Sequence, residues 1–240
     1  MQDSLYVALS SQVALERRLN TIADNVANST TVGYRATGVK FEDVVSGTGS
    51  RAVSFVSSGS TYLSPASGSM LETGNPLDFA IQGDAWFAVA TPAGTVMTRD
   101  GRFTLANSGA LVTVEGHPVL DAGGAPIQLD PNDGPPKAGA DGSLTQDGRL
   151  VGAIGRFAFD PGIDFQRYGN SGVLNRNRLE PQVDTQDVGV SQGFVEQSNV
   201  NPMLEMMHLI QVQRTFENMS ALIRETGSSV DEAIKTLGSK

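Results

Sequence analysis

Two histidines, His117 and His208, are the only imidazole side chains in the 240-residue sequence. A nucleophilic triad needs a histidine beside a serine or cysteine and an acidic residue, and a histidine metal cluster needs several imidazoles close together. His117 precedes Pro118 in an expected hairpin, and His208 stands in an expected helix. We interpret both as satisfied surface histidines, so the sequence predicts no catalytic histidine.

Acidic and glycine-containing segments could form a calcium loop or a phosphate loop. The acidic residues gather in "DPND", residues 130–133, and "DGSLTQDG", residues 141–148. An EF-hand loop needs glutamate at its twelfth position, which is Gly152 when counted from Asp141. A phosphate loop needs Gly-Lys-Ser/Thr, which the sequence lacks. We therefore predict turns in both segments, with no metal, no cofactor and no enzyme activity.

Composition also limits the class of partner. The sequence has 17 Lys and Arg against 26 Asp and Glu, a net charge of -9, so it has no basic field to attract nucleic acid. It has no cysteine for a disulfide framework. The opening residues lack the positive region of a signal peptide, and no run approaches the roughly 18 apolar residues of a spanning helix. We expect a protein without a cleaved signal and without direct membrane insertion.

The N-terminal segment has the pattern of an amphipathic helix. Its apolar face, interrupted by one glutamine, comprises Leu5, Ala8, Gln12, Leu15, Leu19, Ile22 and Val26. Steps of three and four residues place these side chains on one helix face. We expect the helix to begin near Asp3 or Ser4 and to end before "NSTTVG", residues 28–33, where β-branched and turn-forming residues gather.

The C-terminal segment repeats the pattern. Asn201 is the predicted N-cap, and Pro202 suits the first helical position. The apolar stripe that follows comprises Leu209, Val212, Phe216, Met219, Ile223, Val230 and Leu237. A second stripe of Met203, Met206 and Ile210 widens the apolar surface near the start of this helix.

Between the two helices, short apolar runs alternate with Gly, Pro, Asn and Asp turn signals, most clearly in residues 77–129, which predicts β-hairpins. The predicted fold class is α+β, with long terminal helices pairing as a coiled-coil-like hairpin and a β-rich central domain. The expected segments are a helix and turn (1–40), an extended linker (41–75), the β-rich domain (76–165), an extended return linker (166–198) and a helix (199–240).

Heptad stripes at both termini leave two interpretations open. Such stripes commonly pack inside one subunit. Here, however, they sit at the chain ends, and a lone two-helix hairpin covers only one side of each helix. The open flank favours a chain whose helices find further partners in neighbouring subunits.

Three separate motifs, in the right order, resemble the flagellar rod and hook protein family. "TIADNVANSTTVGYRA", residues 21–36, is similar to the family's N-terminal signature, and "SNVNPMLEMMHLIQVQRTFE", residues 198–217, to its C-terminal one. "GNPLDFAIQGDAWFAV", residues 74–89, and "TRDGRFTLANSGALVTVEGHPVL", residues 98–120, resemble its shared β-domain motifs. The departures, which retain shape or polarity, are Asp24 for Asn, Tyr34 and Arg35 for Phe and Lys, and Ala85 and Trp86 for Gly and Phe.

The resemblance implies a structural subunit of the bacterial flagellar basal body. Its partners would be copies of itself and other rod and hook–basal-body subunits, stacked helically in the periplasm-spanning rod to transmit motor torque. It would leave the cell through the flagellar type III export apparatus without a cleaved signal peptide. The short length and compact body look most like the proximal rod members, and the somewhat longer distal rod members are the alternative.

Within this interpretation, the predicted assembly interface combines both stripes with the end of the first helix. Asn25, Asn28 and Thr31 can also bond the backbone where that helix ends, which is simple capping, and Gly33 permits a sharp turn. The full set is Leu5, Leu15, Leu19, Ile22, Asn25, Val26, Asn28, Gly33, Met206, Leu209, Ile210, Val212, Phe216, Met219 and Ile223.

A self-contained β-domain binding module is the alternative from a different class. Such a module would present aromatic side chains on its surface, and Trp86 and Phe87 are the candidates. Adjacent residues of a strand point to opposite faces, so we expect at least one of this pair in the core.

Overall fold

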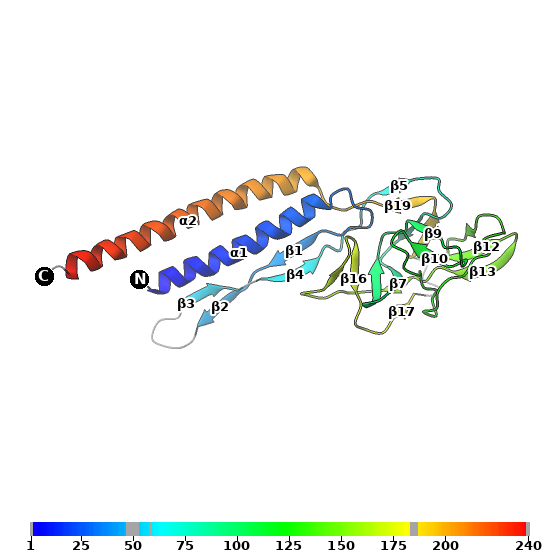
Figure 1. The fold of residues 1–240 in the computed structure, drawn as a ribbon, viewed down its shortest axis with the longest axis horizontal. Coiled ribbons are helices and arrows are strands. Elements are labelled where there is room, and N and C mark those ends of the chain that lie inside the picture. Colours follow the sequence, from blue (N-terminus) through cyan, green and yellow to red (C-terminus); the bar gives the residue numbers. More distant parts are fainter. Residues whose placement is uncertain (1, 47–52, 58, 183–186, 239–240) are drawn as a thin grey trace. The chain divides into compact units, whose positions relative to one another are not determined.

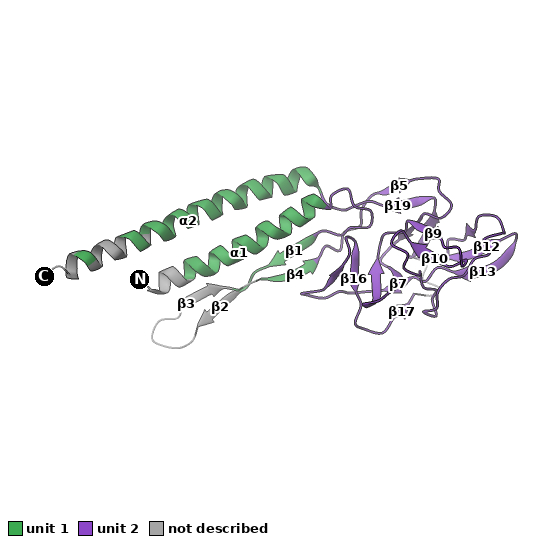
Figure 2. Cartoon of the chain, viewed as in Figure 1, with its two compact units in different colours: residues 1–27, 37–62, 201–240 green, residues 28–36, 63–200 purple. Residues whose placement is uncertain are grey.

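The computed structural model describes residues 2–46, 53–57, 59–182 and 187–238. Within these residues the chain begins with helix α1 (Gln2–Ala27), continues through a β-rich region and ends with helix α2 (Pro202–Gly238) (Figure 1). This order confirms the predicted terminal helices and β-rich middle. The chain divides into two compact units (Figure 2): unit 1 comprises residues 1–27, 37–62 and 201–240, and unit 2 comprises residues 28–36 and 63–200.

Unit 1 contains the two helices, which lie side by side and run antiparallel (Figure 1). Strand β1 (Thr37–Lys40) pairs with β4 (Ser60–Leu63), and β2 (Asp43–Ser46) pairs with β3 (Val53–Val56). Both β1 and β3 lie against α1. The Oδ1 atom of Asn201 accepts a hydrogen bond from the backbone N–H of Leu204 at 3.2 Å, which confirms the predicted N-cap of α2.

Unit 2 is built from short antiparallel pairings. Its four-stranded sheet has the order β15 (Arg167–Tyr168), β16 (Gly172–Leu174), β8 (Gly94–Thr98) and β7 (Phe87–Thr91). A three-stranded sheet contains β11 (Lys137–Ala138), β12 (Ser143–Gln146) and β13 (Arg149–Ala153). The remaining pairs are β5 (Met70–Glu72) with β19 (Phe194–Glu196), β6 (Phe79–Gln82) with β18 (Gly189–Gln192), β9 (Phe103–Leu105) with β10 (Leu111–Thr113), and β14 (Phe157–Ala158) with β17 (Glu180–Pro181).

The core of unit 2 consists of two clusters that use alternate residues of the same strand. Phe87 packs in the larger cluster, where its ring lies edge-on to that of Phe103 at 5.2 Å. Trp86 packs in the smaller cluster with Met97 and Phe157. Trp86 is 4% exposed and Phe87 is fully buried, so both members of this aromatic pair are core residues. The strand alternation thus supplies both clusters from one segment.

Local and distant pairings alternate along the chain. The hairpins β7–β8, β9–β10 and β12–β13 join neighbouring segments, as the turn signals predict. In contrast, β6, β8 and β14 pair with β18, β16 and β17 respectively. Residues 166–198, expected as an extended return linker, therefore supply strands to four of the sheets in unit 2.

Candidate functional site: terminal helices and the turn after the first helix

The two apolar stripes meet within unit 1. Ile22 of α1 and Val212 of α2 are buried, with exposures of 5% and 4%. The half-buried members of the predicted interface are Leu15, Leu19, Val26, Leu209, Phe216, Met219 and Ile223. The predicted side chains of Leu5, Val230 and Leu237 lie outside the described part of the chain. Among the described positions, the stripes therefore already pack partly against elements of their own unit.

A group of apolar side chains on α2 is exposed instead. We call Met203, Met206, Met207 and Ile210 the Met patch; their exposures are 73%, 47%, 61% and 53%. Spacings of three and four residues place them on one face of the helix. At about 3.6 residues per turn, Met203 and Val212 are half a turn out of phase, so the Met patch faces away from the buried seam. Of the predicted interface residues, Met206 and Ile210 belong to this exposed face.

Asn25 has a local partner. It is 3% exposed, its Nδ2 donates to the carbonyl of Thr37 at 3.0 Å, and its Oδ1 accepts from the N–H of Thr37 at 2.9 Å. This reciprocal pair fastens the start of β1 to the last turn of α1. Asn28 and Thr31 form the following turn, where the N–H of Thr31 donates to the carbonyl of Asn28 at 3.1 Å. The side chain of Asn25 thus bonds main chain beyond the end of α1, whereas Asn28 takes part in the turn through its backbone carbonyl.

Gly33 makes the closest backbone approach in this turn. Its φ is +70°, and a Cβ atom added there would overlap the backbone of Arg99 and Asp100. Its N–H donates to the carbonyl of Glu196 at 2.7 Å. Only glycine satisfies both the dihedral angle and the missing space. Gly33 is therefore engaged inside unit 2.

Two arginines and one glutamate form a buried ion-pair cluster beside this turn. The carboxylate of Glu196 accepts from Arg35 at 3.0 Å on Oε1 and from Arg99 at 3.1 Å on Oε2, and these three side chains are at most 3% exposed. Oε1 also accepts the N–H of Gly68 at 3.0 Å. Arg99 donates further to the carbonyls of Ile81 and Gly83. We refer to Arg35, Arg99 and Glu196 as the ion-pair cluster.

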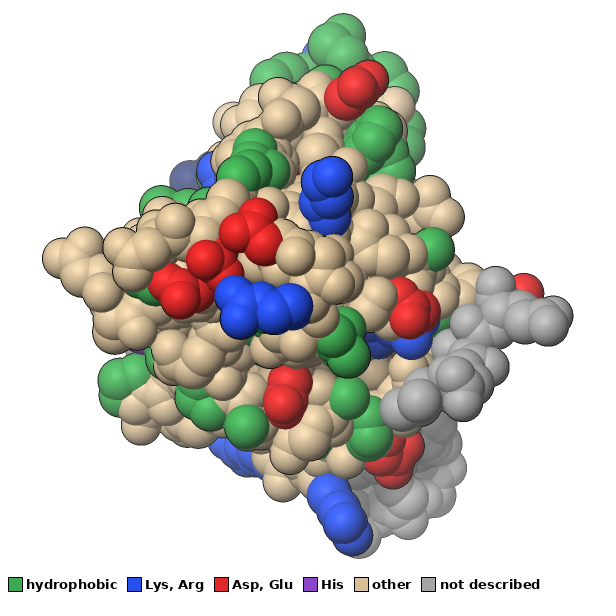
Figure 3. Space-filling model, turned by 90° about the vertical axis from the view of Figure 1, so that its right-hand side faces the viewer, with side chains coloured by type: hydrophobic (Ala, Val, Ile, Leu, Met, Phe, Trp, Pro, Cys, Tyr) green, Lys and Arg blue, Asp and Glu red, His purple; other side chains and the backbone are tan. Residues whose placement is uncertain are grey.

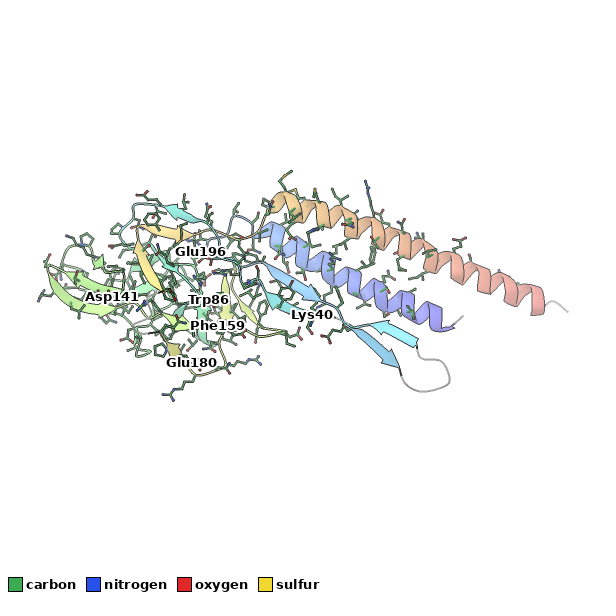
Figure 4. All side chains as sticks on the ribbon, turned by 180° about the vertical axis from the view of Figure 1, so that it is seen from behind. Lys40, Trp86, Asp141, Phe159, Glu180 and Glu196 are labelled. Atoms are coloured by element: carbon green, nitrogen blue, oxygen red, sulfur yellow. The ribbon has the colours of Figure 1, made fainter. Side chains whose placement is uncertain are left out.

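Trp86 lies against both arginines of the ion-pair cluster, and Figure 4 labels it together with Glu196. The guanidinium carbons of Arg35 and Arg99 lie 5.6 Å and 5.4 Å from the centre of its ring. Among the described residues, the Nε atoms of both arginines have no hydrogen-bond partner, so the ring face contributes to stabilising these cations. Burial lowers the pKa of Arg99 to about 10, against the opposing effect of Glu196, and Arg99 therefore stays charged at neutral pH.

Sequence reasoning missed this cluster. The family motifs mark Arg35 and Trp86 as departures, and Trp86 is also a candidate surface aromatic, but no sequence pattern singles out Arg99 or Glu196. No local pattern around these charged residues reveals which opposite charge each one meets. The cluster depends on three segments that are far apart in sequence.

The remaining chemical candidates stay isolated. His117 Nε2 lies 3.4 Å from the hydroxyl of Tyr168 and 3.7 Å from Glu115, and His208 Nδ1 lies 3.8 Å from Glu205. In the described ranges no three His, Asp or Glu side chains are grouped to hold a metal, and no described helix is long and apolar enough to span a membrane. On the face drawn in Figure 3, hydrophobic side chains occur in small groups between acidic and basic ones.

Three family models match the chain. Residues 5–35 match the flagella basal body rod protein family, and residues 80–152 match the flagellar hook protein FlgE/F/G D1 domain. Residues 191–236 match the flagellar basal body rod FlgEFG protein C-terminal family. Together the three matches include most of α1, much of the β-rich region and most of α2.

Curated relatives match over the full length. The chain is 72% identical to flagellar basal-body rod protein FlgF of Mesorhizobium japonicum over 240 residues, with both chains covered completely. It is 55% identical to the FlgF of Rhizobium meliloti, with 99% of each chain covered. It is 32% identical to flagellar basal-body rod protein FlgG of Bacillus subtilis, with 98% of each covered. The identity is thus higher to these FlgF proteins than to this FlgG.

The ion-pair cluster generates a prediction for Glu196→Ala. The substitution leaves two guanidinium groups buried without their carboxylate, so we expect the free energy of unfolding of unit 2 to fall by about 3–5 kcal/mol. Urea denaturation followed by the fluorescence of Trp86, the single tryptophan, measures this loss. The control Glu180→Ala removes an exposed carboxylate and should change the free energy by no more than about 0.5 kcal/mol. Equal midpoints for the two variants would contradict the role of the cluster.

Comparison of Gly33→Ala with Gly74→Ala distinguishes two effects of the added methyl group, which are the strain of a positive φ and the overlap with neighbouring backbone. Both glycines have nearly the same φ, +70° and +69°, but an added Cβ at Gly74 meets nothing within 4 Å. Gly33→Ala should therefore lower the free energy of unfolding by about 1–3 kcal/mol more than Gly74→Ala, because only its methyl group is forced against Arg99 and Asp100. The same denaturation experiment measures both. Equal losses would mean that the neighbouring backbone moves aside without cost.

Proposed function

The chain belongs to the flagellar basal-body rod protein family, and we propose that it is the proximal rod subunit, which assembles helically through its terminal helices to transmit motor torque to the hook. The rod is its location, and its role there is structural. We propose further that it has no enzymatic activity, that its partners are copies of itself and other rod subunits, and that the flagellar type III export apparatus carries it out of the cell without a cleaved signal.

The observation that carries the assembly proposal is the exposed Met patch on α2. One face of α2 packs within unit 1 at Val212, while the opposite face presents four large apolar side chains to solvent. Methionine side chains are flexible and adapt to a partner surface. A surface that faces away from the chain's own helix pair has its complement on another subunit. Contacts between two different surfaces of identical subunits generate a helical assembly when the rotation from one subunit to the next does not close a ring.

The predicted coiled-coil-like hairpin is part of the same proposal. The antiparallel helices, the heptad spacing of both stripes and the burial of Ile22 and Val212 support it. In an assembled rod, the half-buried residues of the stripes, such as Leu15 and Phe216, would gain contacts with neighbouring copies. The predicted segments at residues 1–40 and 199–240 would then act as the axial helices.

The two alternatives have less support. A distal rod role is disfavoured because the chain is only 32% identical to the FlgG of Bacillus subtilis, against 72% and 55% to the two FlgF proteins. A self-contained binding module would need its aromatic pair on the surface, whereas Trp86 and Phe87 are buried. The flagellar rod interpretation accounts for both the family and the exposed helix face.

Met206→Gln combined with Ile210→Gln tests the Met patch. Because both side chains are already exposed in the lone chain, the fold should keep its stability. Desolvated apolar anchors commonly contribute more than 1 kcal/mol each, so association between subunits should weaken about tenfold or more. The measurement is the yield of intact hook–basal bodies, and swimming, in cells that lack the native chain.

Leu150→Gln is the matched control, since Leu150 is 71% exposed on β13 of unit 2. It should leave hook–basal bodies at the native yield. Thermal unfolding of each purified chain, followed by circular dichroism, checks that the monomers remain folded. Native assembly by the double variant would remove the Met patch from the interface.

A further inference from the structure

Every connection between the two units leaves unit 2 from one of three segments. The chain passes between the units at residues 27/28, 36/37, 62/63 and 200/201. Inside unit 2 these connections lie at the ends of three segments, which we call the three connecting segments. They are residues 28–36, 63–69 and 196–200. How they are held within unit 2 decides whether a force on one connection reaches the others.

The amide of Asn199 binds both other connecting segments. Its Oδ1 accepts from the N–H of Ala36 at 2.7 Å. Its Nδ2 donates to the carbonyl of Ala66 at 2.6 Å and to the hydroxyl of Ser64 at 3.2 Å. One side chain from the third segment is thus hydrogen-bonded to the first and the second. A single amide supplies both a donor and an acceptor, which this arrangement requires.

Arg35 reinforces the same junction from the first segment. Its guanidinium donates to the carbonyls of Pro65 and Ala66 at 2.8 Å and 2.7 Å, and it pairs with Glu196. Arg35 thereby reaches both other segments, as Asn199 does. Because it is 3% exposed, solvent competes little for these bonds.

Backbone hydrogen bonds complete the junction. The N–H of Ser64 donates to the carbonyl of Ala36 at 2.8 Å, and that of Gly33 donates to Glu196 at 2.7 Å. The N–H of Gln197 donates to the carbonyl of Ser69 at 2.8 Å. Each pair of connecting segments is therefore joined directly, by main chain as well as by side chains.

We propose that Asn199 and Arg35 are positioning residues that clamp the three connecting segments together, so that a load entering through one connection is shared by all. This inference rests on the proposed function, because a rod subunit must carry torque. Asn199 acts through the segments that it joins.

Gln146 provides a matched control inside the same unit. Its amide also makes three bonds, accepting from the N–H of Asp130 and donating to the carbonyls of Asp130 and Gly134. It joins β12 to a loop, and neither of these contains a connection to unit 1. Gln146→Ala therefore removes the same number of bonds as Asn199→Ala without touching the clamp.

Hydrogen exchange followed by mass spectrometry on the purified full chain tests the clamp without requiring a rod. Asn199→Ala should speed amide exchange about tenfold in all three connecting segments at once. Gln146→Ala should speed exchange only near residues 130–146. Ser64→Ala, which removes one bond, should give a smaller increase in the same three segments and serves if Asn199→Ala folds poorly. An increase confined to the Ala36 amide would overturn the clamp, because Asn199 would then be a local cap.

Swimming in media of increasing viscosity tests whether the clamp shares load among the three connecting segments. Both variants should form hook–basal bodies, but Asn199→Ala cells should lose swimming at a lower viscosity than Gln146→Ala cells. Equal responses to viscosity would overturn load sharing even if the exchange result held. Failure of the proposed assembly through the Met patch would appear separately, as native assembly by the Met patch variant.

Discussion

The carboxylate of Glu196 is the interaction on which the β unit depends. Glu196 lies at the end of β19 and brings together Arg35 from the turn after α1 and Arg99 from the end of β8. Two cations and one anion removed from water are costly unless every oxygen is satisfied. Here the N–H of Gly68, backbone carbonyls that accept from both arginines, and the face of Trp86 supply further contacts. The cost of desolvation makes alternative positions of these three segments unfavourable, which fixes the path of the chain.

In the rest of unit 2, side-chain amides hold separate loops together by hydrogen bonds to their main chain. The strands of unit 2 have only two to five residues, so backbone ladders alone tie few loops together. Gln192 accepts from the N–H of Ala138 and donates to the carbonyls of Pro76 and Pro136, and Gln146 bridges β12 to the loop at Asp130. Asn199 does the same at the connections. Each amide offers a donor and an acceptor, and it can therefore satisfy main-chain groups on two separate loops.

Sequence reasoning succeeds where the signal is local. Heptad spacing identifies both helices, Asn201 identifies the start of α2, and turn residues identify the hairpins β7–β8 and β9–β10. Sequence reasoning fails where interacting residues are far apart in the chain, as for β6 with β18 and for Arg99 with Glu196. The local sequence around one partner does not identify the other. For the candidate site, apolar spacing finds the residues of the helix stripes but cannot tell Val212, which is buried, from Ile210, which is exposed.

Val212 is buried and Ile210 is exposed, so the two side chains of α2 differ in the apolar area that association can still remove from water. A side chain already buried in unit 1 has given up its contact with water before any partner arrives, so it adds little further apolar area on association. An exposed side chain of the Met patch retains that area, and association can still remove it from water. The seam at Ile22 and Val212 therefore stabilises the helix pair in the lone chain, whereas the Met patch remains available to drive association. On α2, the buried position that stabilises the helix pair and the exposed Met patch lie on opposite faces of the helix.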